Sequence, residues 1–309
     1  MADLDCTVDL GRGLRLRTPV LTASGTFAYG FDAPLVDRGA LGAIVTKGTT
    51  LRPRSGNSPA RIAETPSGML NAIGLQNPGV DAVRREYAPR WAAWDLPVIV
   101  NVAGDRLEDY VEVVRRLDGV PGVSGIELNV SCPNVAAGMQ FGVDARLAAQ
   151  LTAAVRAATS LHLMVKLTPN VTELVPIARA VADAGADSVS AVNTYVGMAI
   201  DLRRRRPVLA NEVGGLSGPA IKPLALHAVW EVVPAVSIPV VGMGGISGPQ
   251  DALEFLLAGA AAVQLGTVNY VNPNAAREVL DGIRGYALER GWSDLRPFPL
   301  RASPVPSHA

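Results

Sequence analysis

Cysteine, net charge and long apolar runs are all scarce in this sequence, and each shortage excludes a class of protein. The only two cysteines, Cys6 and Cys132, are too few for a disulfide framework or for a four-thiolate iron-sulfur cluster. Basic and acidic residues number 28 each, so the formal net charge is zero and nothing indicates nucleic-acid binding. No uninterrupted apolar run approaches the roughly 18 residues of a membrane span.

The N-terminus and the histidines exclude two further features. Met1 to Asp9 holds three aspartates and no basic flank before an apolar run, so we expect no signal peptide and a soluble, cytoplasmic protein. His162 opens a predicted strand, His227 lies in a predicted helix and His308 lies in the terminal segment. We therefore predict no metal site.

Short apolar runs alternate with helical patterns along the whole chain. The runs are apolar at nearly every position, which is typical of parallel strands that are covered on both faces. Eight such runs within 309 residues predict a single-domain (β/α)8 TIM barrel, residues 1–309. The predicted strands are 19–23, 43–46, 97–102, 125–130, 163–167, 188–192, 239–243 and 262–265, and the clearest helices are 107–117, 145–158, 171–184, 224–233 and 250–258.

The segments outside this alternation have their own patterns. Residues 1–17 predict an N-terminal β-hairpin around Gly11 and Gly13, placed at the bottom of the barrel. Residues 48–79 and 195–218 are too long for simple turns, and such long excursions build the C-terminal face of a barrel. Residues 292–309 are proline-rich and predict a loose tail. The run Arg203 to Arg206 is compatible with a solvated loop and with a docking or anion-facing surface.

Polar residues stand where six of the predicted strands end. Functional side chains of a TIM barrel project from these positions, and six polar residues in register are hard to explain as turn residues alone. The last two strands end instead in glycine-containing segments, where backbone N–H groups commonly hold phosphate. The strand-end residues are Ser24, Lys47, Asn101, Asn129, Lys166 and Asn193, followed by Gly244 with Gly245 and Gly266 with Thr267.

The loop GMGGISGPQD favours a mononucleotide phosphate. It does not match GxGxxG, so a dinucleotide fingerprint is not supported. Gly244 and Gly245 allow close approach of a ligand to the backbone, and we expect Ser247 to cap the helix that begins near Pro249.

Three residue types in the predicted site suggest redox chemistry on a flat ring. Lys166 would neutralise charge at the N1/C2 carbonyl edge of a flavin; the alternative is a structural pair with Glu127. Cys132 follows the fourth strand in a glycine-containing loop and has the thiol of a general base, with an ordinary pKa of about 8.5; the alternative is a small buried hydrophobe. Asparagines offer the amide groups that complement a ring of alternating N–H and C=O groups, namely Asn71, Asn129 and Asn193.

These residues occur in motifs that together resemble the class 1 dihydroorotate dehydrogenases, most closely the NAD-linked class 1B type. The resemblance runs from about residue 7 to 290. It rests on TASGTFAYG (22–30), VTKG (45–48), SGMLNAIGLQNPG (67–79), NVAG (101–104), ELNVSCPN (127–134), KLTPN (166–170), NT (193–194), GGLSGPAIKP (214–223), GMGGI (242–246) and LGT (265–267).

The resemblance implies oxidation of (S)-dihydroorotate to orotate in pyrimidine (UMP) biosynthesis. It implies that Cys132 takes the proton from C5 while hydride leaves C6 for N5 of FMN. The implied FMN ligands are Ser24, Lys47, Gly48, Asn101, Asn129, Lys166, Val192, Gly218, Gly244, Gly245, Gly266 and Thr267. The implied substrate ligands are Lys47, Asn71, Ala72, Ile73, Gly74, Leu75, Asn129, Asn193 and Thr194.

The same resemblance implies a partner. One FMN per chain is expected, with FAD and [2Fe-2S] only on an electron-transfer flavoprotein subunit that reduces NAD. A homodimer core with two such subunits would form a heterotetramer. Three alternatives stay open: a stand-alone fumarate-dependent enzyme of the same family, a related oxidoreductase of pyrimidine bases, and a nucleotide-binding barrel without redox activity. The run Arg203 to Arg206 is denser than the family usually shows; this departure concerns the partner-facing surface and leaves the chemistry unchanged.

Overall fold

Eight parallel strands form a closed barrel in the computed structural model, which describes residues 4–31, 37–131, 141–296, 298 and 300. The order around the barrel is β3-β16-β15-β10-β9-β8-β7-β4. A parallel bridge between Leu21 in β3 and Ala43, directly before β4, joins the two ends of this order and closes the barrel. The predicted TIM barrel is confirmed. The strands are β3 (Val20–Thr22), β4 (Ile44–Val45), β7 (Val98–Val102), β8 (Gly125–Asn129), β9 (His162–Lys166), β10 (Ser188–Ala191), β15 (Val240–Met243) and β16 (Ala262–Leu265).

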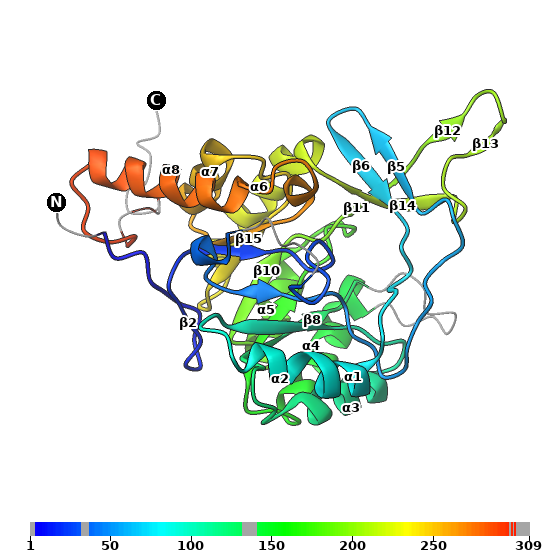
Figure 1. Ribbon diagram of the computed structural model, residues 1–309, viewed down its shortest axis with the longest axis horizontal. Coiled ribbons are helices and arrows are strands. Elements are labelled where there is room, and N and C mark those ends of the chain that lie inside the picture. The colour runs from blue at the N-terminus through cyan, green and yellow to red at the C-terminus, as the bar shows by residue number, and fades with distance from the viewer. Residues whose placement is uncertain (1–3, 32–36, 132–140, 297, 299, 301–309) are drawn as a thin grey trace.

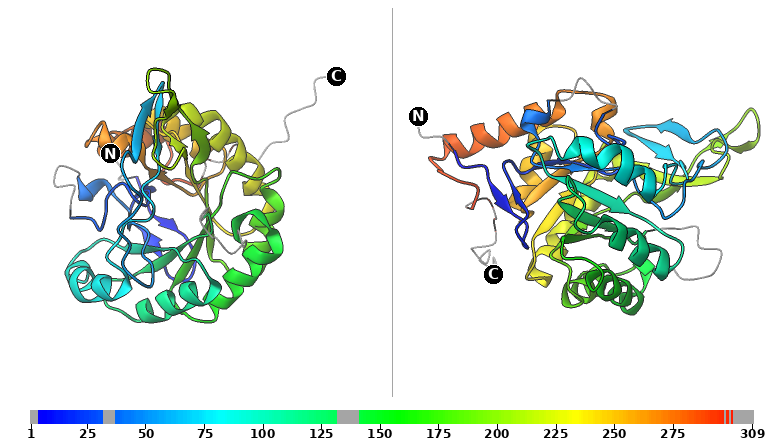
Figure 2. Two further views of the ribbon diagram at one scale, coloured as in Figure 1. Left: turned by 90° about the vertical axis from the view of Figure 1, so that its right-hand side faces the viewer. Right: turned by 60° about the horizontal axis from the view of Figure 1, so that its bottom comes forward.

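Helices surround the strands on the outside of the barrel, as the end-on view in Figure 2 shows. The five helices named from the sequence are present with shifted ends, except that 107–117 agrees at both ends. A helical segment from Val80 to Trp91 and a long C-terminal helix complete the layer. The helices are α1 (Val80–Ala82) and α2 (Ala88–Trp91), joined by the π-helical turn Val83–Tyr87, then α3 (Leu107–Leu117), α4 (Ala145–Arg156), α5 (Val175–Asp183), α6 (Lys222–Val232), α7 (Pro249–Leu257) and α8 (Ala275–Glu289).

Side chains alternate between the outside and the inside of the barrel. On β7, Val98 and Val100 join the large core beneath the helices, whereas Ile99 belongs to a second cluster inside the barrel. This barrel-bottom cluster is closed by the N-terminal hairpin, in which β1 (Val8–Asp9) pairs antiparallel with β2 (Arg15–Leu16). The predicted hairpin is therefore confirmed, and it closes the lower end of the barrel. The cluster consists of Leu10, Leu14, Leu16, Leu21, Ala43, Val45, Ile99, Met164, Val241 and Ala262.

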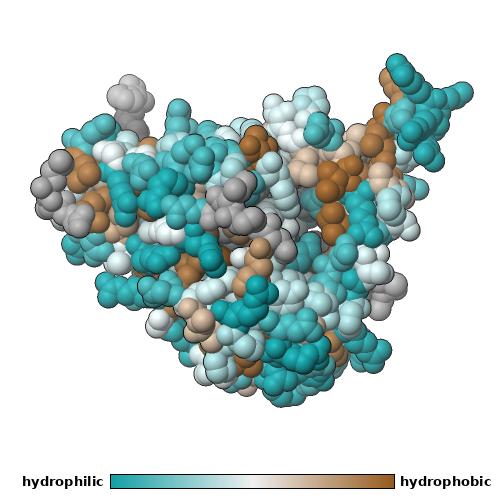
Figure 3. All heavy atoms as spheres, in the orientation of Figure 1, coloured by the Kyte–Doolittle hydropathy of each residue, from teal (hydrophilic) through white to brown (hydrophobic). Residues whose placement is uncertain are grey.

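The two long excursions meet in one antiparallel sheet above the upper end of the barrel, which we call the roof sheet. It contains β5 (Ile62–Thr65), β6 (Gly68–Asn71), β11 (Tyr195–Met198) and β14 (Val213–Ser217), in the order β11-β14-β6-β5. A two-stranded extension, β12 (Ile200–Asp201) with β13 (Arg206–Pro207), projects beyond it (Figure 1). The run Arg203 to Arg206 lies at this exposed tip, which is hydrophilic above an apolar base in Figure 3.

The described part of the C-terminal segment packs against the barrel. The rings of Trp292 and Phe298 lie 5.1 Å apart edge to face, and Phe298 is buried. Asp294 forms a backbone bridge with Asp5. Within the described residues, no helix has the length and apolar character needed to cross a bilayer.

Candidate active site

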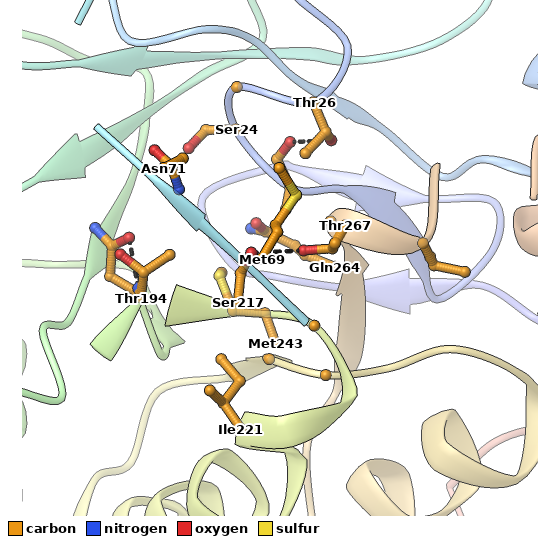
Figure 4. A pocket seen from close by; sticks show the side chains of 18 of the residues that line it. Ser24, Thr26, Met69, Asn71, Thr194, Ser217, Ile221, Met243, Gln264 and Thr267 are labelled. Carbon is orange, nitrogen blue, oxygen red and sulfur yellow. Dashed lines mark hydrogen bonds between the residues drawn. The ribbon is translucent and has the colours of Figure 1, made fainter. Parts of the chain in front are cut away.

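A cavity of about 400 Å³ lies between the upper ends of the barrel strands and the roof sheet. All eight strands or the residues that follow them contribute to its wall, and Figure 4 shows Asn71, Ser217 and Thr267 lining it from separate elements. The structure brings all twelve residues predicted to bind FMN to this one wall. They are Ser24, Lys47, Gly48, Asn101, Asn129, Lys166, Val192, Gly218, Gly244, Gly245, Gly266 and Thr267.

Two lysines and one carboxylate set the charge at the base of this cavity. The Lys166 ammonium donates a hydrogen bond to Ser24 Oγ at 3.1 Å and lies 3.9 Å from the fully buried carboxylate of Glu127. Burial lowers the pKa of Lys47, and the neighbouring Lys166 lowers it further. Among the described residues Lys47 forms no ion pair, so the pair of lysines leaves an excess positive charge that suits an anionic ligand.

The Lys166 and Glu127 pair also bears on the alternative that the sequence left open. At 3.9 Å the two groups interact by charge without a direct hydrogen bond, while the ammonium also lines the cavity. The structural pair and the ligand-facing cation are therefore compatible in one side chain.

Glycines form the part of the wall that follows β15. Gly244 and Gly245 have φ values of +123° and +75°, and a Cβ on Gly245 would lie 2.6 Å from the backbone nitrogen of Lys222. This loop is thus pressed against the start of α6, which keeps its backbone close to the cavity. Thr267, which follows the neighbouring strand β16, donates a hydrogen bond to Ser217 Oγ at 2.8 Å (Figure 4).

The prediction that Ser247 caps α7 is wrong. Gly248, not Ser247, occupies the N-cap position, and its residue type provides no side-chain acceptor. The Ser247 hydroxyl instead donates to Asp251 Oδ2 at 2.6 Å, and the same carboxylate accepts a hydrogen bond from Lys222 at 2.8 Å. The Lys222 ammonium offsets a negative charge that would otherwise disfavour an anion at this helix end.

Most of the predicted substrate ligands lie in the same cavity. The Asn193 amide donates to Asn129 Oδ1 at 3.3 Å, and its own Oδ1 accepts from the Thr194 backbone at 2.8 Å. Asn71 donates to the carbonyl of Gly215 at 3.3 Å, which ties β6 to β14. Lys47, Asn71, Ile73, Leu75, Asn129, Asn193 and Thr194 line the cavity, whereas Ala72 and Gly74 do not. Cys132 lies outside the described residues.

The wall fits a flavin. Two amide oxygens, Asn101 Oδ1 and Gln264 Oε1, are buried without a hydrogen-bond partner, and both side chains line the cavity. Such acceptors require an N–H donor, which a flavin ring carries between two carbonyl groups. Together with the glycine loops and the lysines, the wall offers acceptors for a ring, space for a phosphate and a cation for added charge.

Comparison with known proteins decides the family. The family model for dihydroorotate dehydrogenase matches residues 10–286. The chain belongs to the dihydroorotate dehydrogenase family. It is 53% identical to a protein of Desulforamulus reducens over 94% of this chain and 96% of that protein. A protein of Pelobacter propionicus is 55% identical over 93% of this chain and 95% of its own length. Both relatives are named dihydroorotate dehydrogenase B (NAD(+)), catalytic subunit.

Membership in the dihydroorotate dehydrogenase family confirms the class of enzyme that the motifs predicted, an oxidoreductase of pyrimidine biosynthesis. Several wall residues of this family member were missed from the sequence: Met69, Ser217, Met243, Gln264 and Tyr270. Gln264 had a usable signal, because a glutamine inside the buried run AAVQL needs a polar partner within the barrel. Ser217 and Met69 had none, since only the roof sheet places them over the cavity.

Proposed function

We propose that this chain binds one FMN and oxidises dihydroorotate to orotate as the catalytic subunit of an NAD-linked enzyme. The observation that carries the proposal is the convergence of all twelve expected FMN ligands on one cavity with two lysines. Family membership supports the same reaction. FMN, when bound, supplies the hydride acceptor, and the protein residues supply binding, orientation and proton transfer.

Each side of the cavity has its own part in this proposal. The glycine loops around Gly245 and Gly266 hold the FMN phosphate through backbone N–H groups. Lys166 stabilises negative charge on the ring. Asn71, Asn193 and Thr194 hold the pyrimidine ring of the substrate below the roof sheet, and protonated Lys47 pairs with its carboxylate. Cys132 takes the proton from C5 of dihydroorotate.

A test of FMN binding and of the first half-reaction needs only the purified chain. We expect a yellow protein with one noncovalent FMN per chain, which loses its colour when dihydroorotate is added without oxygen. Protein that stays colourless after reconstitution with FMN contradicts the proposal. Yellow protein that dihydroorotate does not bleach contradicts the assigned substrate.

The route of electrons to NAD requires a second polypeptide. The sequence contains no GxGxxG motif, and two cysteines cannot ligate a [2Fe-2S] cluster. We propose a homodimer core that binds two subunits carrying FAD and [2Fe-2S]. The isolated chain should reduce artificial dyes without forming NADH, and co-expression with such a subunit should restore NADH formation. NADH from the isolated chain would refute this, and rapid fumarate reduction would indicate the stand-alone type.

A further inference from the structure

One buried carboxylate, Glu127, contacts more polar groups than any role assigned so far requires. It lies on β8 inside the barrel, with none of its surface exposed. Its Oε1 accepts a hydrogen bond from Asn101 Nδ2 at 2.7 Å. Its Oε2 accepts from Gln264 Nε2 at 2.9 Å and from Ser190 Oγ at 3.0 Å. Three strands on different sides of the barrel are therefore tied to one side chain.

These contacts determine which way the two amides face. A carboxylate only accepts hydrogen bonds, so each amide must turn its NH₂ group toward Glu127. The carbonyl oxygens of Asn101 and Gln264 are thereby directed away from Glu127, and both are the unpartnered buried atoms of the cavity wall. Both side chains are only 1% exposed, so water does not readily satisfy them. A Cβ at position 48 would lie 3.0 Å from Asn101 Oδ1, so Gly48 keeps side-chain atoms away from this oxygen.

We propose that Glu127 is a positioning residue that fixes Asn101 and Gln264 as paired acceptors for the ring imide N–H of the flavin. This inference rests on the proposed function. The acceptors lie deep in the barrel, where Gln264 Nε2 also approaches Met164 of the barrel-bottom cluster at 3.6 Å. The substrate ligands Asn71 and Thr194 come from the upper loops and the roof sheet, so the ring that reaches the deep acceptors is the flavin.

The substitution Glu127→Gln tests whether Glu127 orients the two amides or only fills space inside the barrel. A glutamine of the same shape places one NH₂ group where a carboxylate oxygen was, so this group faces the NH₂ of Asn101 or of Gln264 at hydrogen-bond distance, and two donors cannot bond to each other. One amide then turns over and presents N–H to the N–H of the ligand. Ser190→Ala is the matched control, because it removes a hydrogen bond to the same carboxylate and leaves both amides in place.

The readout is the ratio of dissociation constants for 3-methyl-FMN and FMN, measured by fluorescence on apoprotein. A methyl group at N3 removes the N–H, so wild-type protein and Ser190→Ala should bind 3-methyl-FMN at least about tenfold more weakly than FMN. Glu127→Gln should weaken FMN binding and reduce the ratio of the two dissociation constants to less than about three. An unchanged ratio in folded Glu127→Gln protein would overturn the proposal.

Two further arms keep the outcome decisive. If Glu127→Gln does not fold, as judged by circular dichroism, wild-type protein alone decides: equal affinity for FMN and 3-methyl-FMN would refute the assignment. The second arm compares orotate with 3-methylorotate on the FMN-loaded protein. A preference there, without one for FMN, would mean that the acceptors bind the pyrimidine instead, which also overturns the flavin assignment. Bleaching by dihydroorotate tests the proposed function separately from both arms.

Discussion

The ion pair between Lys166 and Glu127 predicts a measurable energetic coupling. At 3.9 Å, two unit charges attract by about 4 kcal/mol with an effective dielectric constant near 20. Lys166→Met removes the one cation within 4 Å of Glu127 among the described residues, so the buried carboxylate loses this stabilisation. Breaking a buried pair costs about 3–5 kcal/mol. With an unfolding entropy of about 2.1 cal/mol/K per residue, 4 kcal/mol lowers the melting temperature of a 309-residue chain by about 6 °C.

A double-mutant cycle on apoprotein measures this coupling. The variants are Lys166→Met, Glu127→Gln and the double variant, followed by urea unfolding at pH 7. The double variant should lose about 3–4 kcal/mol less than the sum of the single losses, because it leaves no unpaired buried charge. Ser24→Ala is the control: it removes the 3.1 Å hydrogen bond to Lys166 and should cost only about 1 kcal/mol. Single losses that add to within about 0.5 kcal/mol would refute the reasoning.

Three further predictions concern ligand binding and catalysis. Gly245→Ala should weaken FMN binding at least about tenfold in fluorescence titrations, because the new Cβ meets the Lys222 backbone at 2.6 Å and displaces the loop; unchanged affinity would contradict the phosphate assignment. Burial and Lys166 lower the pKa of Lys47 below 10.5. At pH 7 the protonated Lys47 therefore reduces the free energy of unfolding of the apoprotein, and this loss of stability disappears as the pH rises toward 10.5. Lys47→Met should therefore raise the melting temperature at pH 7 but not at pH 10.5, while weakening orotate binding at pH 7; equal melting-temperature changes at both pH values would contradict this. Cys132→Ala should retain FMN and slow its reduction by dihydroorotate at least about 100-fold in stopped-flow measurements, whereas a rate close to wild type would exclude Cys132 as the base.

The barrel was predictable because its strands are buried on both faces. The run 97–102 is apolar at all positions but Asn101, and the observed β7 lies within it. The ends of these strands then indicated the cavity wall, since parallel strands place their carboxyl ends on one face. The local sequence pattern was therefore sufficient to place those residues of the cavity wall that stand at the end of a barrel strand.

The roof sheet was not predictable by the same reasoning. Asn71 pairs with Gly215, and the partners are 144 residues apart. The strand VGGLS is rich in glycine and has no clear alternation, so its sequence alone does not indicate a strand. Glu127 was noted only as a possible partner of Lys166. Its contact with Asn101 depends on the register of two neighbouring strands, and its contacts with Ser190 and Gln264 reach strands that are not neighbours of β8. Interactions across the barrel carry no signal in any single segment.

The barrel closes where β16, its last strand in the sequence, pairs with β3, its first, so closure comes late in synthesis of the chain. The Asn269 amide donates a hydrogen bond to Thr26 across 243 residues of chain, and β16 pairs with β3. A chain growing from its N-terminus therefore exposes the open edges of β3 and β15 until Ala262 to Leu265 has been made. Open edges favour pairing with other chains, so the interval before the last strand docks is the stage most prone to aggregation. Because β16 and the loop after it complete the cavity, a cofactor held there is captured only after synthesis has passed Thr267.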